Sequence, residues 1–298
     1  MAVKQLVFPR LYTAMITPFK DNLEVDFDGA AQLAEYLIDN GSDGIVVCGT
    51  TGEAPVLSVE ERLGLYTVIQ NKVGHKAEVW AGTGTNHTEF SAELAKKAEK
   101  CGVHGIMLVT PYYNKPNQQG LYEHFKKIAD SISLPVMLYN VPGRTSCNLL
   151  PDTIKKLSAV ENITAVKEAS GNMDQVSLLI SLIPERMAVY CGDDSLTLPM
   201  MSLGAQGVVS VASHLIGNDI RQMMESFCAG EVEKARAIHQ RLFPLFRGLF
   251  VTSNPIPLKA ALNMMGLPAG GLRLPLVSAN EEEKQFIKKL ISDMGLLK

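Results

Sequence analysis

The sequence predicts a closed barrel of eight parallel strands alternating with helices, a (β/α)8 TIM barrel, followed by a C-terminal helical extension. Short β-rich runs recur as far as residue 213, and helical stretches with apolar residues at i, i+3 and i+4 lie between them. The runs are continuously apolar, which is typical of parallel strands covered on both faces. Eight such units match the barrel, and a doubly wound open sheet is the alternative.

The predicted strands cover residues 11–19, 44–49, 79–84, 105–110, 135–141, 163–170, 188–194 and 207–213. They are rich in Val, Ile and Tyr, which favour strands, and most of them end in glycine or polar residues. The clearest helices cover 26–41, 58–73 and 87–102. The first two of these begin with Asp and Ser, which are residues that can cap a helix.

After residue 215 the strand signal stops. Four helical segments follow at 217–230, 231–250, 255–266 and 280–295. We therefore predict a catalytic barrel over residues 1–225 and a C-terminal helical region over 226–298. No linker rich in Pro, Gly or Ser separates the two, so we expect the helical region to pack on the barrel in a structural or oligomeric role.

The composition is that of an ordinary soluble protein. The 298 residues are 46% hydrophobic and carry a formal net charge of -3. Because the charges form no basic concentration, neither a nucleic-acid nor a membrane partner is expected. The first ten residues contain no signal-peptide core and no later stretch could span a bilayer, so we expect a cytoplasmic protein.

Cysteine and histidine usage gives no sign of a metal site or of a disulfide framework. The five cysteines are scattered without a C-x-x-C pair, and the six histidines show no H-x-H or H-E-x-x-H spacing. We predict free thiols, no metal and no cofactor.

The candidate site follows from the predicted fold, because the working residues of such barrels gather at the carboxyl ends of the strands. Polar residues at these ends are "CGTTGE" (48–53), "TPYYNKP" (110–116), "YNVPGRT" (139–145), Lys167 and "GDD" (192–194). All of them are predicted to face one mouth of the barrel.

Lys167 is an ammonium group in an apolar strand. Strand alternation predicts that Ile163, Ala165, Lys167 and Ala169 face the interior, where small neighbours leave room for a long side chain. Poor hydration there lowers the pKa of a lysine and yields the neutral amine that forms a Schiff base with a carbonyl. The alternative is a lysine that pairs with a carboxylate or turns toward solvent.

The neighbouring motifs supply groups that such chemistry needs. Tyr139 could relay protons, Thr50 and Thr51 with adjacent backbone N–H groups could hold a small carboxylate, and Arg144 could bind a carboxylate in a bidentate manner. A buried structural tyrosine, a plain turn and a surface arginine remain the alternative interpretations.

"GTTGE", "TPYYNKP", "YNVPGRT" and "VKEASGN", in this order and at these intervals, closely resemble the dihydrodipicolinate synthase family. The resemblance covers essentially the whole chain. The family belongs to the pyruvate-dependent Schiff-base lyases, which are (β/α)8 barrels with a helical C-terminal extension. Neuraminate lyases of that superfamily have a G-S-T-G-E pattern and lack an arginine at position 144, so the resemblance favours the synthases.

The resemblance implies a role for eight residues. Lys167 would form the Schiff base, and the other catalytic residues would be a proton-relay triad of Tyr139, Thr50 and Tyr113, the last donated across a dimer interface. Arg144 would bind the carboxylate of the second substrate. The remaining substrate-binding residues would be Thr51, Gly192 and Val209.

The activity implied by the resemblance is condensation of pyruvate with L-aspartate 4-semialdehyde, the first committed step toward diaminopimelate and lysine. The resemblance also implies a homotetramer built as a dimer of dimers. Phe90 stands where lysine-sensitive members tend to carry Glu, so weak or absent inhibition by lysine is expected. Two alternatives stay open, namely another pyruvate-dependent class I aldolase and a non-catalytic pyruvate-binding barrel.

Overall fold

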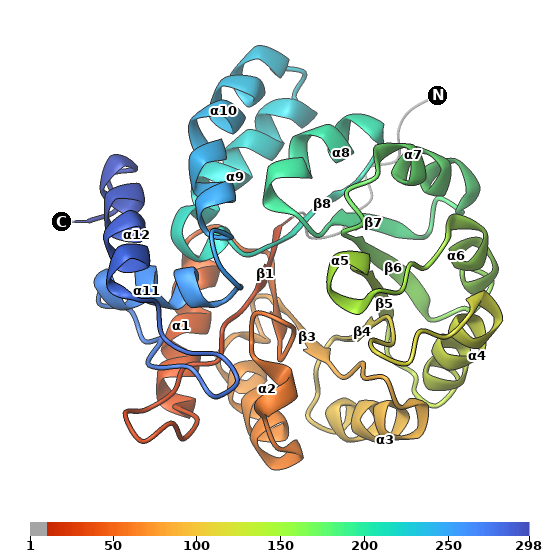
Figure 1. Ribbon diagram of the computed structural model, residues 1–298. Helices are drawn as coiled ribbons and strands as arrows, with labels where there is room; N and C mark the ends of the chain where they lie inside the picture. Colours follow the sequence, from red (N-terminus) through yellow and green to blue (C-terminus); the bar gives the residue numbers. More distant parts are fainter. Residues whose placement is uncertain (1–10, 298) are drawn as a thin grey trace.

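The computed structural model describes residues 11–297, so the amino-terminal stretch searched for a signal peptide lies outside the described residues. Eight parallel strands close into a barrel in sequence order, and β1 pairs with β8 (Figure 1). The strands are β1 (Leu11–Ala14), β2 (Gly44–Val47), β3 (Glu78–Gly82), β4 (Gly105–Val109), β5 (Val136–Asn140), β6 (Ile163–Glu168), β7 (Ala188–Cys191) and β8 (Gly207–Ser210). The predicted barrel is confirmed and the open sheet is excluded.

Helices surround the strands, and most predicted segments are found within a few residues of their expected ends. Asp26 caps α1, and Ser58 with Glu61 forms a reciprocal capping box at the start of α2. The helices are α1 (Phe27–Asp39), α2 (Val59–Val73), α3 (Thr88–Glu99), α4 (Gln118–Ala129), α5 (Pro142–Thr145), α6 (Pro151–Leu157), α7 (Met173–Leu182), α8 (Thr197–Leu203), α9 (Ser213–Cys228), α10 (Val232–Gly248), α11 (Ile256–Met264) and α12 (Glu281–Asp293), with 3-10 turns η1 (Ala54–Val56) and η2 (Asp194–Leu196).

The alternation of the strands separates two apolar cores. Side chains between strands and helices form the larger core, and inward-facing side chains fill the barrel. Ala165 and Ala169 belong to the interior as predicted, but Ile163 packs in the outer core. The prediction for Ile163 was wrong because the pairing of β5 with β6 contains a register shift between Val136 and Met137.

The late helices gather on one side of the barrel, next to α1 (Figure 1). The expected boundary between residues 225 and 226 falls inside α9, which begins directly after the eighth strand. The division into two regions therefore stays a prediction. The helical region is in any case tied closely to the barrel loops.

A buried ion pair makes that connection. Lys259 of α11 lies 2.7 Å from the carboxylate of Glu53, and each side chain is only 1% exposed. Lys259 also donates to the carbonyl of Gly271 and lies over the ring of Phe19. Burial lowers the pKa of Lys259 to about 8, and the negative charge of Glu53 opposes this shift. The last residue of "GTTGE" is thus held by the C-terminal region.

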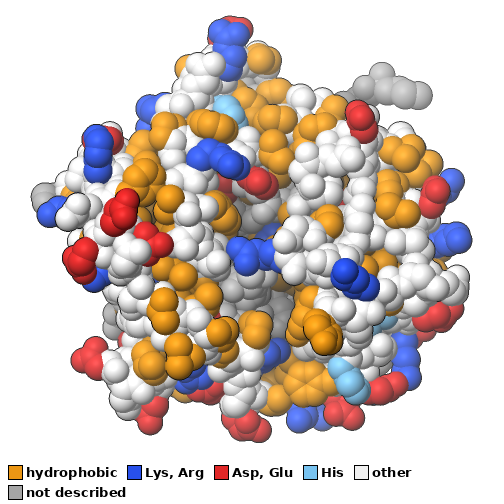
Figure 2. All heavy atoms as spheres, in the orientation of Figure 1, with side chains coloured by type: hydrophobic (Ala, Val, Ile, Leu, Met, Phe, Trp, Pro, Cys, Tyr) orange, Lys and Arg blue, Asp and Glu red, His pale blue; other side chains and the backbone are white. Residues whose placement is uncertain are grey.

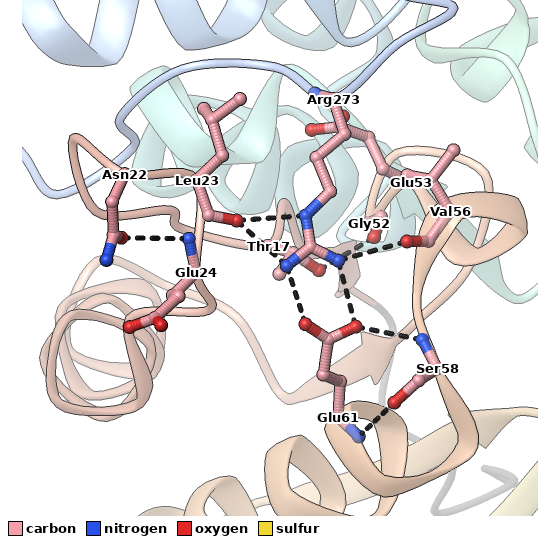
Figure 3. A network of polar contacts seen from close by, with 10 residues as sticks. All are labelled: Thr17, Asn22, Leu23, Glu24, Gly52, Glu53, Val56, Ser58, Glu61 and Arg273. Carbon is pink, nitrogen blue, oxygen red and sulfur yellow. Dashed lines mark hydrogen bonds and ion pairs between the residues drawn. The ribbon is translucent and has the colours of Figure 1, made fainter.

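Arg273 extends the same contact, as Figure 3 shows. Its guanidinium donates to Glu61 at 2.8 and 2.5 Å and to the carbonyls of Leu23 and Val56. Its backbone N–H donates to Glu53 at 3.2 Å. Six hydrogen bonds therefore join the loop after α11 to segments near the start of the chain.

The buried pair predicts the stability of a Glu53→Gln variant. The substitution leaves the Lys259 ammonium without its counter-charge, and loss of one partner of a buried pair costs about 3–5 kcal/mol in the free energy of unfolding. The loss should shrink as the pH rises toward 8, because Lys259 in the variant lacks the Glu53 charge that raises its pKa and therefore loses its proton below pH 8. Urea unfolding between pH 6 and 9 measures both effects.

Glu89→Gln is the matched control, since Glu89 forms an ion pair with Lys127 in which both side chains are more than half exposed. An exposed pair contributes about 1 kcal/mol or less. Equal unfolding midpoints for the two variants would show that the Glu53–Lys259 pair contributes no more to the free energy of unfolding than an exposed pair.

Candidate active site

A cavity of about 170 Å³ opens at the carboxyl ends of the strands and contains Lys167. Figure 2 shows the same face of the molecule, which is hollowed over the barrel with Lys and Arg side chains beside the hollow. Six of the eight predicted site residues line this cavity together. They are Thr50, Thr51, Tyr139, Arg144, Lys167 and Gly192.

Lys167 lies on β6, faces the interior and is 4% exposed. Among the described residues its ammonium nitrogen makes no hydrogen bond or ion pair, and it lies 4.3 Å from the centroid of the Tyr139 ring. Burial lowers the pKa of Lys167 to about 8, while the charge of Asp194 acts in the opposite direction. A neutral amine is therefore accessible at a pH only slightly above neutral.

The carboxylate whose charge raises the pKa of Lys167 is hydrogen-bonded to other groups. Asp194 accepts hydrogen bonds from the hydroxyl of Ser210 and from the backbone N–H groups of Val211 and Ala212. These three donors fix the carboxylate beside the end of β8. Asp194 thus influences Lys167 through space without forming an ion pair with it.

Gly192 leaves the room that the lysine needs. A Cβ atom built at this position would lie 2.7 Å from the Cβ of Ala169 and 3.1 Å from Cε of Lys167. Both separations are shorter than van der Waals contact. Any larger residue at 192 would therefore displace the lysine stem or the adjacent strand.

Tyr139 lies opposite Lys167 in the pairing of β5 with β6. Burial raises the pKa of its phenol, while the positive charge of Arg144 and a hydrogen bond with Thr50 lower it. The phenol consequently keeps its proton at neutral pH and has a hydroxyl partner with which to exchange it.

Arg144 lines two adjoining chambers. A second cavity of about 200 Å³ adjoins the first and shares Thr50, Tyr139 and Arg144 with it. Arg144 is on the short helix α5 directly after β5. Its guanidinium can therefore meet a carboxylate that enters beside Lys167 from either chamber.

The loop over residues 48–53, which contains Thr50 and Thr51 and is called the threonine loop below, is supported by the C-terminal helical region. Asn254 donates from its side-chain amide to the hydroxyl of Thr51 at 2.9 Å. The loop is bounded by Cys48 and Glu53, whose φ angles of 55° and 54° are left-handed. The loop conformation is therefore unusual at both ends, and contacts from α11 and the segment before it hold it in place.

Two predicted residues do not line either chamber. Tyr113 is 91% exposed and has a left-handed φ of 73°. Val209 is buried in the barrel interior, and Val211, two residues further on, lines the cavity instead. The roles assigned to Tyr113 and Val209 stay predictions.

Asp193, Phe250 and Asn254 also line the cavity, and only Asp193 belongs to a motif that the sequence singled out. Asn254 and Phe250 come from the C-terminal region, where helical periodicity gave no sign of a site. A polar asparagine directly before the first proline of "SNPIP" was the only local signal.

Within residues 11–297, no three His, Cys, Asp or Glu side chains come together in a way that could hold a metal ion. Over the same residues, no helix is long and apolar enough to cross a membrane.

The sequence matches a model of the dihydrodipicolinate synthetase family over residues 7–294. A 4-hydroxy-tetrahydrodipicolinate synthase from Heliobacterium modesticaldum is 53% identical over 289 residues, which cover 97% of this chain and 96% of that protein.

Solved structures agree with the sequence match. A dihydrodipicolinate synthase from Bacillus anthracis has a TM-score of 0.94 and 48% identity, and the alignment covers 97% of this chain and 99% of that one. A dihydrodipicolinate synthase from Cyanidioschyzon merolae with lysine bound has a TM-score of 0.96 and 47% identity, with coverage of 97% and 99%.

The lowered pKa of Lys167 predicts its reactivity. Its acetylation by dilute acetic anhydride should accelerate roughly tenfold per pH unit below pH 8 and level off above it, because only the neutral amine reacts. Peptide mass spectrometry measures the rate at this residue, and Lys167→Ala identifies the peptide. A rate still climbing steeply between pH 9 and 10 would contradict the lowered pKa.

Proposed function

The chain belongs to the dihydrodipicolinate synthetase family, and on this premise we propose that it condenses pyruvate with L-aspartate 4-semialdehyde to give 4-hydroxy-tetrahydrodipicolinate, through a Schiff base on Lys167. The observation that carries the proposal is the unpaired, buried amine of Lys167 beside the Tyr139 ring at the barrel mouth. Relatives about half identical over nearly the whole chain are named for this reaction.

The first steps use Lys167 and Tyr139. The neutral amine attacks C2 of pyruvate, and the carbinolamine loses water when its hydroxyl receives a proton from the phenol. The hydroxyl of Thr50 is hydrogen-bonded to Tyr139 and passes protons to and from it. The protonated iminium that results withdraws electrons, so a C3 proton is lost and an enamine forms.

The second substrate then adds. The enamine carbon attacks the aldehyde carbon of the semialdehyde, whose carboxylate pairs with Arg144, and the aldehyde oxygen takes up a proton to become a hydroxyl group. The substrate's own amine displaces Lys167 from C2, and the ring closes with the lysine regenerated. One water is released for each pyruvate consumed, and neither a metal nor a diffusible cofactor takes part in these steps.

The anchoring of pyruvate falls to the threonine loop. Thr50 and Thr51 line the cavity beside Lys167, and Asn254 fixes the Thr51 hydroxyl. With that hydroxyl held, the loop offers hydroxyl and backbone donors to the pyruvate carboxylate. Gly192 lines the same cavity, and we propose that Val209, which is buried in the barrel interior, supports the pyruvate pocket from behind its lining.

The exposure of Tyr113 supports an oligomer. A tyrosine that is 91% exposed on a left-handed residue does not reach its own cavity. We propose that Tyr113 of the partner subunit completes the proton relay, and that two such dimers form a homotetramer. A biosynthetic reaction that starts from pyruvate also favours a cytoplasmic location.

Inhibition by lysine is proposed to be weak. A groove beside the site is lined by Arg62, Asn86, Phe90 and Tyr112, and two carboxylates, Glu89 and Glu93, lie at the same groove. Glu89 is already paired with Lys127. Arg62 adds a positive charge and Phe90 supplies no carboxylate, so the part of the groove at these two residues offers little to the ammonium groups of lysine.

The proposed activity predicts a clear preference among aldehydes. Purified protein should consume pyruvate rapidly with aspartate semialdehyde and far more slowly with N-acetylmannosamine or glyceraldehyde, because Arg144 needs a nearby carboxylate. Lys167→Ala should fold normally and lose activity by roughly four orders of magnitude or more.

Preference for another aldehyde would identify a sister aldolase with the same Schiff-base mechanism. Failure of borohydride to trap a pyruvate adduct on the wild-type protein would instead indicate a non-catalytic barrel. Near-normal turnover in Lys167→Ala would contradict the role of that lysine.

The partner contribution predicts complementation between inactive variants. Tyr113→Phe and Lys167→Ala homo-oligomers should each be nearly inactive. Mixed and reassembled oligomers should regain up to about a quarter of wild-type activity, because one site in four then has both residues intact when the variants mix at random. Activity assays after mild dissociation and mixing measure this, and no recovery in confirmed hetero-oligomers would show that Tyr113 does not act across an interface.

A further inference from the structure

A buried polar pair lies directly behind the reactive pair. Tyr139 faces Lys167 inside the barrel, and the next residues along β5 and β6, Asn140 and Glu168, are also paired in register. Successive strand residues point to opposite faces, so Asn140 and Glu168 lie outside the barrel wall. They are 0% and 1% exposed.

The outer pair is specific in its hydrogen bonding. The side-chain amide of Asn140 donates to one oxygen of Glu168 at 3.0 Å, and the backbone N–H of Ser170 donates to the other at 2.6 Å. The side-chain oxygen of Asn140 accepts from the backbone N–H of Leu149, and its side-chain amide donates a second hydrogen bond to the side-chain oxygen of Asn148. Each side-chain donor and acceptor of Asn140 therefore has its own partner. Rotating the Asn140 amide by half a turn would break these hydrogen bonds.

The pairing of β5 with β6 is interrupted by a bulge before it reaches this pair. Val136 pairs with Ile163, but Met137 pairs with Ala165, so β6 has one extra residue before the reactive pair. Without that extra residue, Asn140 would lie opposite Lys167. A slip of one residue turns each side chain to the other face of its strand. Lys167 would then point into the layer between strands and helices.

We propose that Asn140 and Glu168 are positioning residues, whose hydrogen bond selects the bulged register of β5 and β6 and thereby places Lys167 and Tyr139 on the same side of the barrel wall. The inference rests on the proposed function, since it concerns the Schiff-base lysine of that reaction. Neither residue touches substrate. They act by fixing the strand register, which sets the positions of the neighbouring residues Lys167 and Tyr139.

The test exchanges donor and acceptor. Asn140→Asp replaces the amide donor with a carboxylate that faces Glu168, so the selecting bond is lost. Adding Glu168→Gln restores it with reversed polarity, because the new amide donates to the new carboxylate while its oxygen still accepts from Ser170. The double variant also keeps a single negative charge at the pair, as in the wild type.

Asn162→Asp is the matched control. Asn162 precedes β6 at the opposite end of the strand and donates to the carbonyls of Ala129, Ile132 and Leu134. The same chemical change there removes structural hydrogen bonds near β6 without touching the pair. Its melting temperature should fall, while the reactivity of Lys167 should not.

The readout is the rate at which borohydride traps pyruvate on Lys167, measured on variants whose circular dichroism shows a folded barrel. Asn140→Asp should lower the rate about 100-fold, because loss of a hydrogen bond to a charged group shifts the equilibrium between the two registers by roughly this factor. The double variant should recover to within about tenfold of wild type. If Asn140→Asp does not fold, Glu168→Gln alone, which removes one of the two acceptors, serves as the single variant.

A folded single variant trapped at the wild-type rate would overturn the proposal. So would a double variant no faster than the single one. Acetylation of Lys167 separates this proposal from the proposed function, because it needs no pyruvate. If the wild-type protein forms no adduct, unchanged acetylation of Lys167 in Asn140→Asp overturns the positioning role, and slowed acetylation that the double variant restores supports it.

Discussion

Closure of the sheet is the constraint on which the site depends. Because β1 pairs with β8 and all eight strands run parallel, every carboxyl end opens at one mouth. The interior must then be filled by side chains. Tyr12, Trp80 and Tyr190 fill it with edge-to-face ring contacts, whereas Ala169 and Gly192 near the mouth leave the space that Lys167 enters. The cavity is thus the part of the barrel that large side chains do not occupy.

Two buried lysines show why burial alone does not define a reactive amine. Burial lowers the pKa of both Lys167 and Lys259 to about 8. Lys259 is held by Glu53 and by the Gly271 carbonyl, so its charge is compensated and it serves the structure. Lys167 has no such partner among the described residues and lies beside an open cavity. The difference between the two is one of surroundings.

The sequence was sufficient for the barrel because continuous apolar runs and helical periodicity are local signals. It was also sufficient for most of the site, since the carboxyl ends of the strands must converge once the barrel is accepted. It could not show that Ile163 leaves the interior, because the register shift depends on how β6 pairs with β5. It could not show Asn254 either, because this residue reaches the threonine loop from more than 200 positions away in the sequence.

The contacts of Arg273 and Lys259 join parts of the chain that are synthesised at very different times. Arg273 donates to the carbonyl of Leu23, 250 residues earlier, and Lys259 pairs with Glu53. Contacts between such distant segments form late, because long loops must close before they are made. The ribosome therefore completes all eight strands before the supports of the threonine loop emerge. An unfinished chain already contains Lys167 but lacks the contacts that hold the threonine loop in place. The active site is therefore completed only when the last segments have been translated.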